Sequence, residues 1–167
     1  FQQSNNIVKR DTSVLYYDCT NFYFESEQPD EDVVDEVTGE IIKGMRQYGL
    51  SKEHRPNPIV EMGLFMDSRG IPITMCLHPG NTSEQLTAIP LEKEVLKMLP
   101  NARFIYCADV GLGSYNIRKF NSMGGRAFIV TQSIKEMSNT LKEAVFNDYD
   151  YKLLSDHTSV SISKMKN

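Results

Sequence analysis

This sequence contains no tryptophan, only three cysteines and no long apolar run. Its apolar stretches fall short of the roughly 18 residues that a membrane-spanning helix needs, which excludes a helical integral membrane protein. The first residues carry no initiator Met and no basic or apolar region of a signal peptide, so we expect an excised fragment of a cytoplasmic protein. Cys19, Cys76 and Cys107 lie far apart without a Cys-x-x-Cys pair, which argues against zinc and favours buried, reduced thiols.

The composition is that of one ordinary globular domain. A chain of 167 residues has room for a single hydrophobic core, and its 40% hydrophobic and 24% charged residues exclude a disordered tail. The net charge of −4 at first argues against a nucleic-acid partner. However, eight of the acids lie in residues 25–42, and the remainder carries 14 acidic and 18 basic residues. A mildly basic core is compatible with DNA, and equally with ordinary surface charge.

Residues 25–42 contain no Lys or Arg and no aromatic residue, and they include Pro29 and Gly39. This composition predicts a flexible acidic insertion that is solvated on all sides. A divalent-ion site within the run is the less favoured alternative. The insertion separates the first predicted strand from the second.

Apolar runs alternate with helical patterns along the rest of the chain. Strands are predicted at residues 14–19, 59–66, 71–77, 103–108 and 127–131, and helices at about 84–99, 115–123 and 134–146. Residues 67–70 have the composition of a tight hairpin turn. Asn81 and Glu84 suggest a capping box at the start of the first helix, which Pro90 should kink or restart.

The order of these elements predicts the fold class. Three strands joined by hairpins, followed by strands reached through helical crossovers, describe an α/β protein with a mixed five-stranded sheet and helices on both faces. This succession is that of an RNase H-like fold. We expect residues 1–147 to form this core and residues 148–167 to begin a β-rich insertion or tail.

Two aspartates are candidates for chemistry because each lies late in, or directly after, an apolar strand. An unpaired buried carboxylate at Asp18 is costly without a cation or hydrogen bonds. Asp109 precedes a glycine-rich turn, where open α/β sheets place functional groups. If the two strands are parallel neighbours, both carboxylates meet at one edge and suit Mg²⁺ or Mn²⁺ and two-metal phosphoryl transfer. Structural aspartates that cap turns are the alternative.

Two further features each have a functional and a structural interpretation. Lys52, His54 and Arg55 suit contacts with DNA phosphates, which dominate affinity for DNA, or are plain surface charges. The Gly-Leu-Gly-Ser loop at residues 111–114 suggests a nucleotide cradle, but it lacks the third Gly and the acidic partner of the dinucleotide fingerprint. A nucleotide-binding α/β module is therefore a second functional hypothesis.

Five segments resemble, in the same order, motifs of insertion-sequence transposases of the DDE (Asp-Asp-Glu) superfamily. They are residues 17–25 (YDCTNFYFE) around the first Asp, 48–57 (YGLSKEHRPN), the hairpin 63–73 (GLFMDSRGIPI), the turn 79–84 (PGNTSE) and 106–112 (YCADVGL) around the second Asp. The match extends over about residues 14–131. An ordered set of five segments is far more specific than any one of them.

The resemblance implies an RNase H-like catalytic domain that cuts and joins DNA at the ends of a mobile element. It gives Asp18 and Asp109 catalytic and metal-binding roles, with Mg²⁺ or Mn²⁺ as cofactor and two ions in the DNA-bound enzyme. It also implies a homo-oligomer on DNA, located in the bacterial cytoplasm or nucleoid, with no membrane partner.

The third acid of the family has no counterpart in this sequence. That acid is a Glu within a Tyr-x-x-Arg-x-x-x-Glu pattern, and Ser122 stands at the required offset after Tyr115. We therefore expect the Glu to lie beyond residue 167 and the isolated fragment to be inactive. A non-enzymatic DNA-docking scaffold, derived from a decayed transposase, is the third functional hypothesis.

Overall fold

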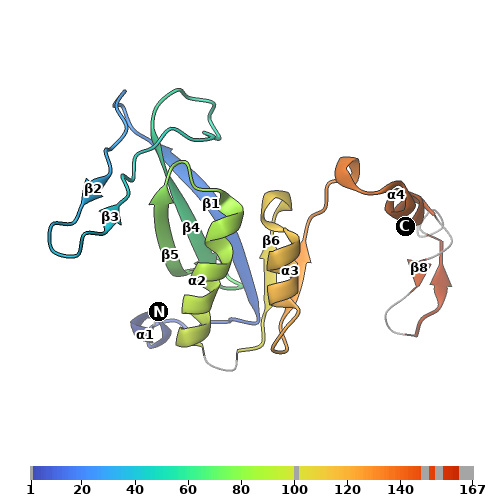
Figure 1. Cartoon of the computed structure of the whole chain (residues 1–167). Helices are drawn as coiled ribbons and strands as arrows, with labels where there is room; N and C mark the ends of the chain where they lie inside the picture. Colours follow the sequence, from blue (N-terminus) through green and yellow to red (C-terminus); the bar gives the residue numbers. More distant parts are fainter. Residues whose placement is uncertain (1, 100–101, 148–150, 153–155, 162–167) are drawn as a thin grey trace. The chain divides into compact units, whose positions relative to one another are not determined.

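The computed structural model describes residues 2–99, 102–147, 151–152 and 156–161 (Figure 1). The chain divides into two compact units, residues 1–131 and 132–167. The first unit contains α1 (Gln2–Asn5), β1 (Val14–Tyr23), β2 (Val33–Val34), β3 (Ile41–Ile42), β4 (Ile59–Met66), β5 (Pro72–Pro79), α2 (Glu84–Met98), β6 (Ile105–Ala108), the 3₁₀ turn η1 (Val110–Leu112), α3 (Tyr115–Asn121) and β7 (Ala127–Val130). The second contains η2 (Ile134–Glu136), α4 (Asn139–Phe146), β8 (Tyr151–Lys152) and β9 (Ser159–Val160).

Five strands of the first unit form one mixed sheet in the order β5-β4-β1-β6-β7. The pairs β1–β4 and β4–β5 are antiparallel, whereas β1–β6 and β6–β7 are parallel. The parallel steps require crossover connections, and these contain α2 and α3. The strand order is that of an RNase H-like fold, so the predicted mixed five-stranded sheet is confirmed.

Side chains alternate between the two faces of β1. The hydroxyl of Tyr17 lies 2.5 Å from Oγ1 of Thr87 in α2, which identifies the face that the helices cover. On this face Tyr17 packs against Phe65 of β4, with ring centroids 4.6 Å apart. Tyr16 and Asp18 point to the other face and are exposed.

The helices α2 and α3 cover one face of the sheet. Val95 of α2 and Ile117 of α3 belong to the same buried core, and α2 lies over β4 and β5 (Figure 1). The α2 helix continues through Pro90 without a restart. The predicted capping box is wrong, because Ser83 rather than Asn81 is the N-cap, and its side chain makes no cap hydrogen bond. A helix on the second face stays a prediction, because α4 belongs to the other unit.

The acidic run contains a short β-hairpin, β2–β3, rather than a segment without secondary structure. Two of its aspartates pair with basic residues that follow the run. Asp30 Oδ1 accepts a hydrogen bond from Arg46 Nε over 2.7 Å, and Asp32 Oδ2 lies 2.5 Å from Lys43 Nζ. These contacts neutralise part of the acidic charge, while the flexibility of the run stays a prediction.

The second unit differs in detail from the prediction of one helix at residues 134–146. The helix α4 begins only after Ser138, whose hydroxyl accepts the backbone N–H of Leu141 over 3.3 Å. The β8–β9 pair lies in the tail that was expected to be strand-like, of which residues 148–150, 153–155 and 162–167 lie outside the described part. The division between the two compact units falls after residue 131, so α4 belongs to the second unit, while the expected domain boundary after residue 147 stays a prediction. No helix among the described residues is long and apolar enough to cross a membrane.

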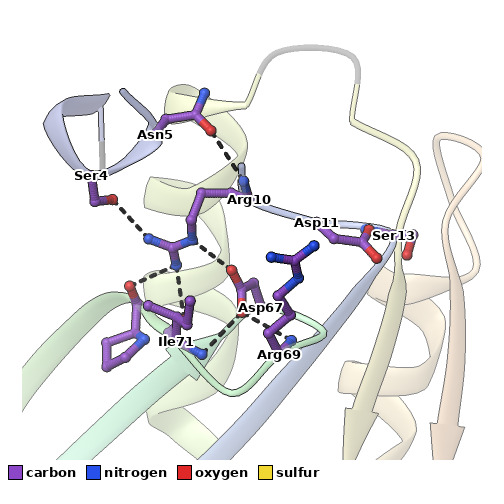
Figure 2. Close-up of polar contacts among 9 residues, drawn as sticks. Ser4, Asn5, Arg10, Asp11, Ser13, Asp67, Arg69 and Ile71 are labelled. Carbon is purple, nitrogen blue, oxygen red and sulfur yellow. Dashed lines mark hydrogen bonds and ion pairs between the residues drawn. The ribbon is translucent and has the colours of Figure 1, made fainter. Parts of the chain in front are cut away.

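The N-terminal segment is fastened to the β4–β5 turn by a buried ion pair (Figure 2). Arg10 Nε donates to Asp67 Oδ2 over 2.5 Å, and the same guanidinium donates to the carbonyl oxygen of Ile71 over 2.8 Å. Asp67 Oδ1 accepts the backbone N–H groups of Arg69 and Ile71. The predicted tight turn at residues 67–70 is confirmed, and Gly70 adopts the positive φ of 75° that favours glycine.

Candidate functional site

Asp18 lies in β1, and Asp109 directly follows β6, the parallel neighbour of β1. Tyr16 of β1 is the register partner of Cys107 of β6. Asp18 and Asp109 each lie two residues further along, Asp18 within β1 and Asp109 directly after the end of β6, so the chain leads both towards the same end of this parallel pair. Neighbouring strands lie about 5 Å apart. The predicted parallel arrangement of these two strands is therefore confirmed (Figure 1).

Each carboxylate is exposed and is held by a hydrogen bond from its own chain. Asp18 Oδ1 accepts the backbone N–H of Cys19 over 2.8 Å. Asp109 Oδ1 accepts the Thr131 hydroxyl over 2.6 Å, which holds this carboxylate at the ends of β6 and β7. The expected burial of Asp18 is wrong, because the alternation of β1 places it on the face that α2 and α3 leave open. A metal at Asp18 is therefore favoured by the parallel pairing of β1 with β6, which Asp109 follows, and not by burial.

The two aspartates offer a cation a pair of hard oxygen donors. Within the described part of the chain, no group of three or more His, Cys, Asp or Glu side chains is arranged to hold a metal ion. Mg²⁺ often binds through one or two carboxylates, and waters and substrate phosphates supply its other ligands. The pair therefore fits Mg²⁺ or Mn²⁺ shared with a phosphate, and it does not fit a closed site made of protein ligands alone.

Lys52 is exposed in the loop before β4, but its ammonium group is directed towards the protein. It donates a hydrogen bond to the carbonyl oxygen of Cys19. The same Nζ lies 3.4 Å from Oε1 of Glu84, in the first turn of α2. Lys52 thus links the middle of β1 to the start of α2, in addition to the DNA contact predicted for it.

His54 and Arg55 are exposed in the same loop. His54 has a positive φ of 55°, which is uncommon for a residue with a side chain. The guanidinium of Arg55 lies 4.2 Å from the ring centroid of Tyr23, and its Nε donates to Glu53 over 2.9 Å. Arg55 is thereby held at the surface, where a phosphate could reach it, and the DNA-binding roles of both residues stay predictions.

Glu61 is a buried carboxylate that the sequence patterns did not single out. It lies in β4 opposite Asn21 of β1, and its side chain is only 4% exposed. Burial raises the pKa of Glu61 above its usual value, and the nearby Glu84 carboxylate adds to the rise, while Lys52 and Asn21 oppose it. The sequence did contain a sign of it, since Glu61 is the single charged residue inside the apolar run 59–66. Charged residues are seldom buried unless they are paired, so such a position suggests a special role.

The glycine loop at residues 111–114 has a packing explanation. A Cβ atom at Gly113 would lie 3.0 Å from Cγ2 of Val130 in β7, so the close approach of loop and strand favours glycine. The α3 helix that follows has only seven residues, and its N-cap Ser114 makes no side-chain cap hydrogen bond. This packing accounts for Gly113 without a bound phosphate.

Two solved transposase structures are similar to this fold. One is the cryo-EM structure of the piggyBac transposase synaptic complex with hairpin DNA, with a TM-score of 0.48, 16% identity and coverage of 79% of this chain and 26% of that one. The other is the Mos1 transposase paired-end complex with the left transposon end, with a TM-score of 0.44, 16% identity and coverage of 78% and 38%. This chain therefore spans well under half of either transposase. No protein-family model matches the sequence, and comparison with curated proteins finds no relative.

Proposed function

We propose that this chain is the catalytic core of a metal-dependent DNA transposase in which Asp18 and Asp109 bind the divalent ion. The observation that carries the proposal is the parallel register of β1 and β6, which pairs Tyr16 with Cys107, two residues before each aspartate. The five motif segments support it, because two of them contain these aspartates. Exposure of both carboxylates leaves room for a DNA phosphate beside them.

The two aspartates would act as the protein ligands of Mg²⁺ or Mn²⁺ during strand cleavage and joining at mobile-element ends. When bound, such an ion supplies activation of the attacking hydroxyl and stabilisation of the leaving oxygen. The Thr131 hydroxyl orients Asp109, and the backbone N–H of Cys19 orients Asp18. Assembly as a homo-oligomer on paired DNA ends belongs to the same proposal.

Calorimetric titration of Mn²⁺ into the chain tests this function. We expect weak binding by the wild-type chain, and loss of this binding in both Asp18→Asn and Asp109→Asn, because each removes one negative oxygen donor. Binding that survives both substitutions would make the aspartates structural and would favour the DNA-docking scaffold. Circular dichroism of each variant shows whether the chain is still folded.

The matched control is Asp35→Asn in the acidic hairpin. Asp35 accepts the backbone N–H groups of Val37 and Thr38, so this variant removes the same charge from a different carboxylate with local hydrogen bonds. We expect it to bind Mn²⁺ as the wild type does. Loss of binding in Asp35→Asn with retention in Asp18→Asn would assign the ion to the acidic run.

A further inference from the structure

A pocket of about 580 Å³ lies at the end of the sheet where the parallel strands β1 and β6 begin. We call it the basic pocket. Its lining comes from residues 9–13, Arg69 in the β4–β5 turn and residues 102–103. Val14 and Ile105 are register partners at this end, and Asp18 lies four residues, or about 13 Å, further along β1. The basic pocket is therefore distinct from the proposed metal site.

Positive charge dominates the lining of the basic pocket. Four of the lining side chains are basic, and only that of Asp11 is acidic. The charge of Arg10 is neutralised by its buried ion pair with Asp67 (Figure 2). The remaining basic side chains are those of Lys9, Arg69 and Arg103. Three positive charges thus stand against one carboxylate, in a chain whose net charge is −4.

The fold does not neutralise these three cations. All three are exposed, and none of them takes part in an ion pair within the described part of the chain. Asp11 is engaged elsewhere, because its Oδ1 accepts the backbone N–H of Ser13 over 3.0 Å. Hydrogen bonds from Ser13 and Ser68 lower the pKa of Asp11, and the charge of Arg69 adds a smaller effect. Cations gathered in one place repel one another, so a bound anion would stabilise this end of the sheet.

The walls of the basic pocket are held in place by the fold. The backbone N–H of Ser68 donates to the carbonyl oxygen of Asp11 over 3.0 Å, which joins the β4–β5 turn to the N-terminal segment. Arg103 lies against the bare backbone of Gly125, where a Cβ atom would be 3.3 Å from its Nε and 3.5 Å from its Cγ. A ligand therefore meets a site whose backbone is already ordered, which lowers the entropic cost of binding.

We propose that the basic pocket binds phosphate groups. The planar guanidinium groups of Arg69 and Arg103 match the oxygens of a phosphate bidentately, and Lys9 adds a point charge. A ligand with at least two negative charges neutralises the excess charge of the pocket, and both a DNA backbone and a free polyphosphate meet this condition. The choice of DNA as the source rests on the proposed function, whereas the binding of phosphate does not.

Titration of a short DNA duplex into the chain at several salt concentrations, with EDTA present, tests the proposal. We expect Arg69→Gln and Arg103→Gln each to weaken binding irrespective of sequence and to reduce the salt dependence of log K by about 1. The double variant should reduce it by about 2. The control Lys93→Gln removes the same charge from an exposed position on α2 and should retain the wild-type slope. Circular dichroism shows whether each variant is folded.

A further variant should strengthen binding. Asp11→Asn removes the one carboxylate of the basic pocket and keeps an oxygen that accepts the backbone N–H of Ser13. We expect this variant to bind phosphate groups more tightly than the wild type does, a gain that loss of structure does not produce. Unchanged or weaker binding by a folded Asp11→Asn chain would contradict the assignment of the pocket.

Calorimetric titration with inorganic pyrophosphate distinguishes the two sources of phosphate. Weaker DNA binding by the Arg69→Gln/Arg103→Gln double variant would assign the pocket to a DNA backbone. Loss of pyrophosphate binding in the double variant with unchanged DNA binding would assign it to a free polyphosphate. Unchanged binding of both probes, or no binding of either by the wild type, would overturn the proposal. Mn²⁺ titration reports separately on the proposed function, because EDTA removes divalent ions from the phosphate-binding samples.

Discussion

Arg10 donates a hydrogen bond to Asp67 over 2.5 Å, and both side chains are almost fully buried. The pair joins the segment before β1 to the turn between β4 and β5 (Figure 2). Burial alone would raise the pKa of Asp67, but the hydrogen bonds from Arg10, Ile71 and Arg69 outweigh it, so the pKa lies below its usual value. The ion pair therefore stabilises the folded state in its charged form.

Asp67→Asn should destabilise the chain by about 3 kcal/mol, because it leaves the buried guanidinium of Arg10 without its counter-charge. Urea unfolding at pH 7 measures the difference. The control Asp11→Asn alters an exposed aspartate of the same region and should change stability far less than Asp67→Asn. Equal stabilities of wild type and Asp67→Asn would show that the pair contributes little.

The same pair predicts acid sensitivity. Because the folded pKa of Asp67 is lowered, its contribution is complete above the unfolded pKa of about 4 and is lost as pH falls through the folded value. Wild type and Asp67→Asn should therefore converge in stability towards low pH. A difference that stays constant from pH 7 down to pH 2 would contradict this linkage.

Glu92 has the opposite pH dependence. It is fully buried, and burial raises its pKa to about 7, although an Asn121 hydrogen bond of 2.9 Å and the charge of Arg126 work against the rise. The nearest Arg126 nitrogen lies 3.5 Å from Glu92 Oε1, and neither atom has a hydrogen-bond partner within the described part of the chain. The hydrogen bond and the nearby charge therefore do not fully offset the cost of burying the ionised Glu92 carboxylate.

Because the pKa of Glu92 is raised in the folded state, the protonated side chain makes its full contribution to stability below pH 4.5. This contribution is lost as pH rises through about 7. We expect Glu92→Gln, which cannot ionise, to gain about 3 kcal/mol relative to wild type between pH 4.5 and pH 8. Unfolding curves at several pH values measure this slope. The exposed variant Glu94→Gln should follow the wild type, and parallel curves for Glu92→Gln would refute the expected ionisation.

Gly63 lies in β4 directly beneath the Tyr17 hydroxyl. A Cβ atom here would lie 2.5 Å from that oxygen and 3.1 Å from the Cys76 sulfur, so Gly63→Ala should cost about 1–3 kcal/mol through overpacking. Gly111→Ala, where a Cβ meets only Glu84 at 3.8 Å, should be close to neutral. Thermal unfolding compares the two, and similar midpoints would mean that the core repacks around Gly63→Ala at no cost.

Arg55 provides the test of the predicted DNA contact. We expect Arg55→Gln to weaken binding to duplex DNA irrespective of sequence and to reduce the salt dependence of log K by about 1, because one phosphate contact is lost. Lys97→Gln removes one charge from an exposed Lys97–Glu94 pair on α2 and serves as control. Identical salt slopes for both variants would assign Arg55 to ordinary surface charge.

The sequence patterns predicted the strands and most helices because these depend on local periodicity. Residues 59–66 and the turn at 67–70 correspond closely to β4 and its hairpin, and the three cysteines are free as expected, although only Cys19 is fully buried. The patterns wrongly predicted that Asp18 is buried, because β1 carries large apolar or aromatic side chains on both faces. Tyr16 and Phe22 lie on the open face with Asp18 and are 40% and 49% exposed. Apolar composition alone does not distinguish a covered face from an open one.

Long-range pairings were beyond these patterns. Arg10 and Asp67 are 57 residues apart, and nothing local to either residue indicates its partner. The cavity of about 620 Å³ lined by Glu61, Lys52 and Glu84 likewise combines a strand, a loop and the start of a helix that come together only in the folded sheet. In contrast, the parallel pairing of β1 and β6 followed from the predicted order of the elements.

The most direct test of the central claim is an anomalous difference map from crystals of the chain grown with Mn²⁺. We expect a peak between the carboxylates of Asp18 and Asp109, and no such peak in crystals of Asp109→Asn. A Mn²⁺ peak confined to the acidic hairpin, or none near either aspartate, would contradict the assignment of this pair as the metal site.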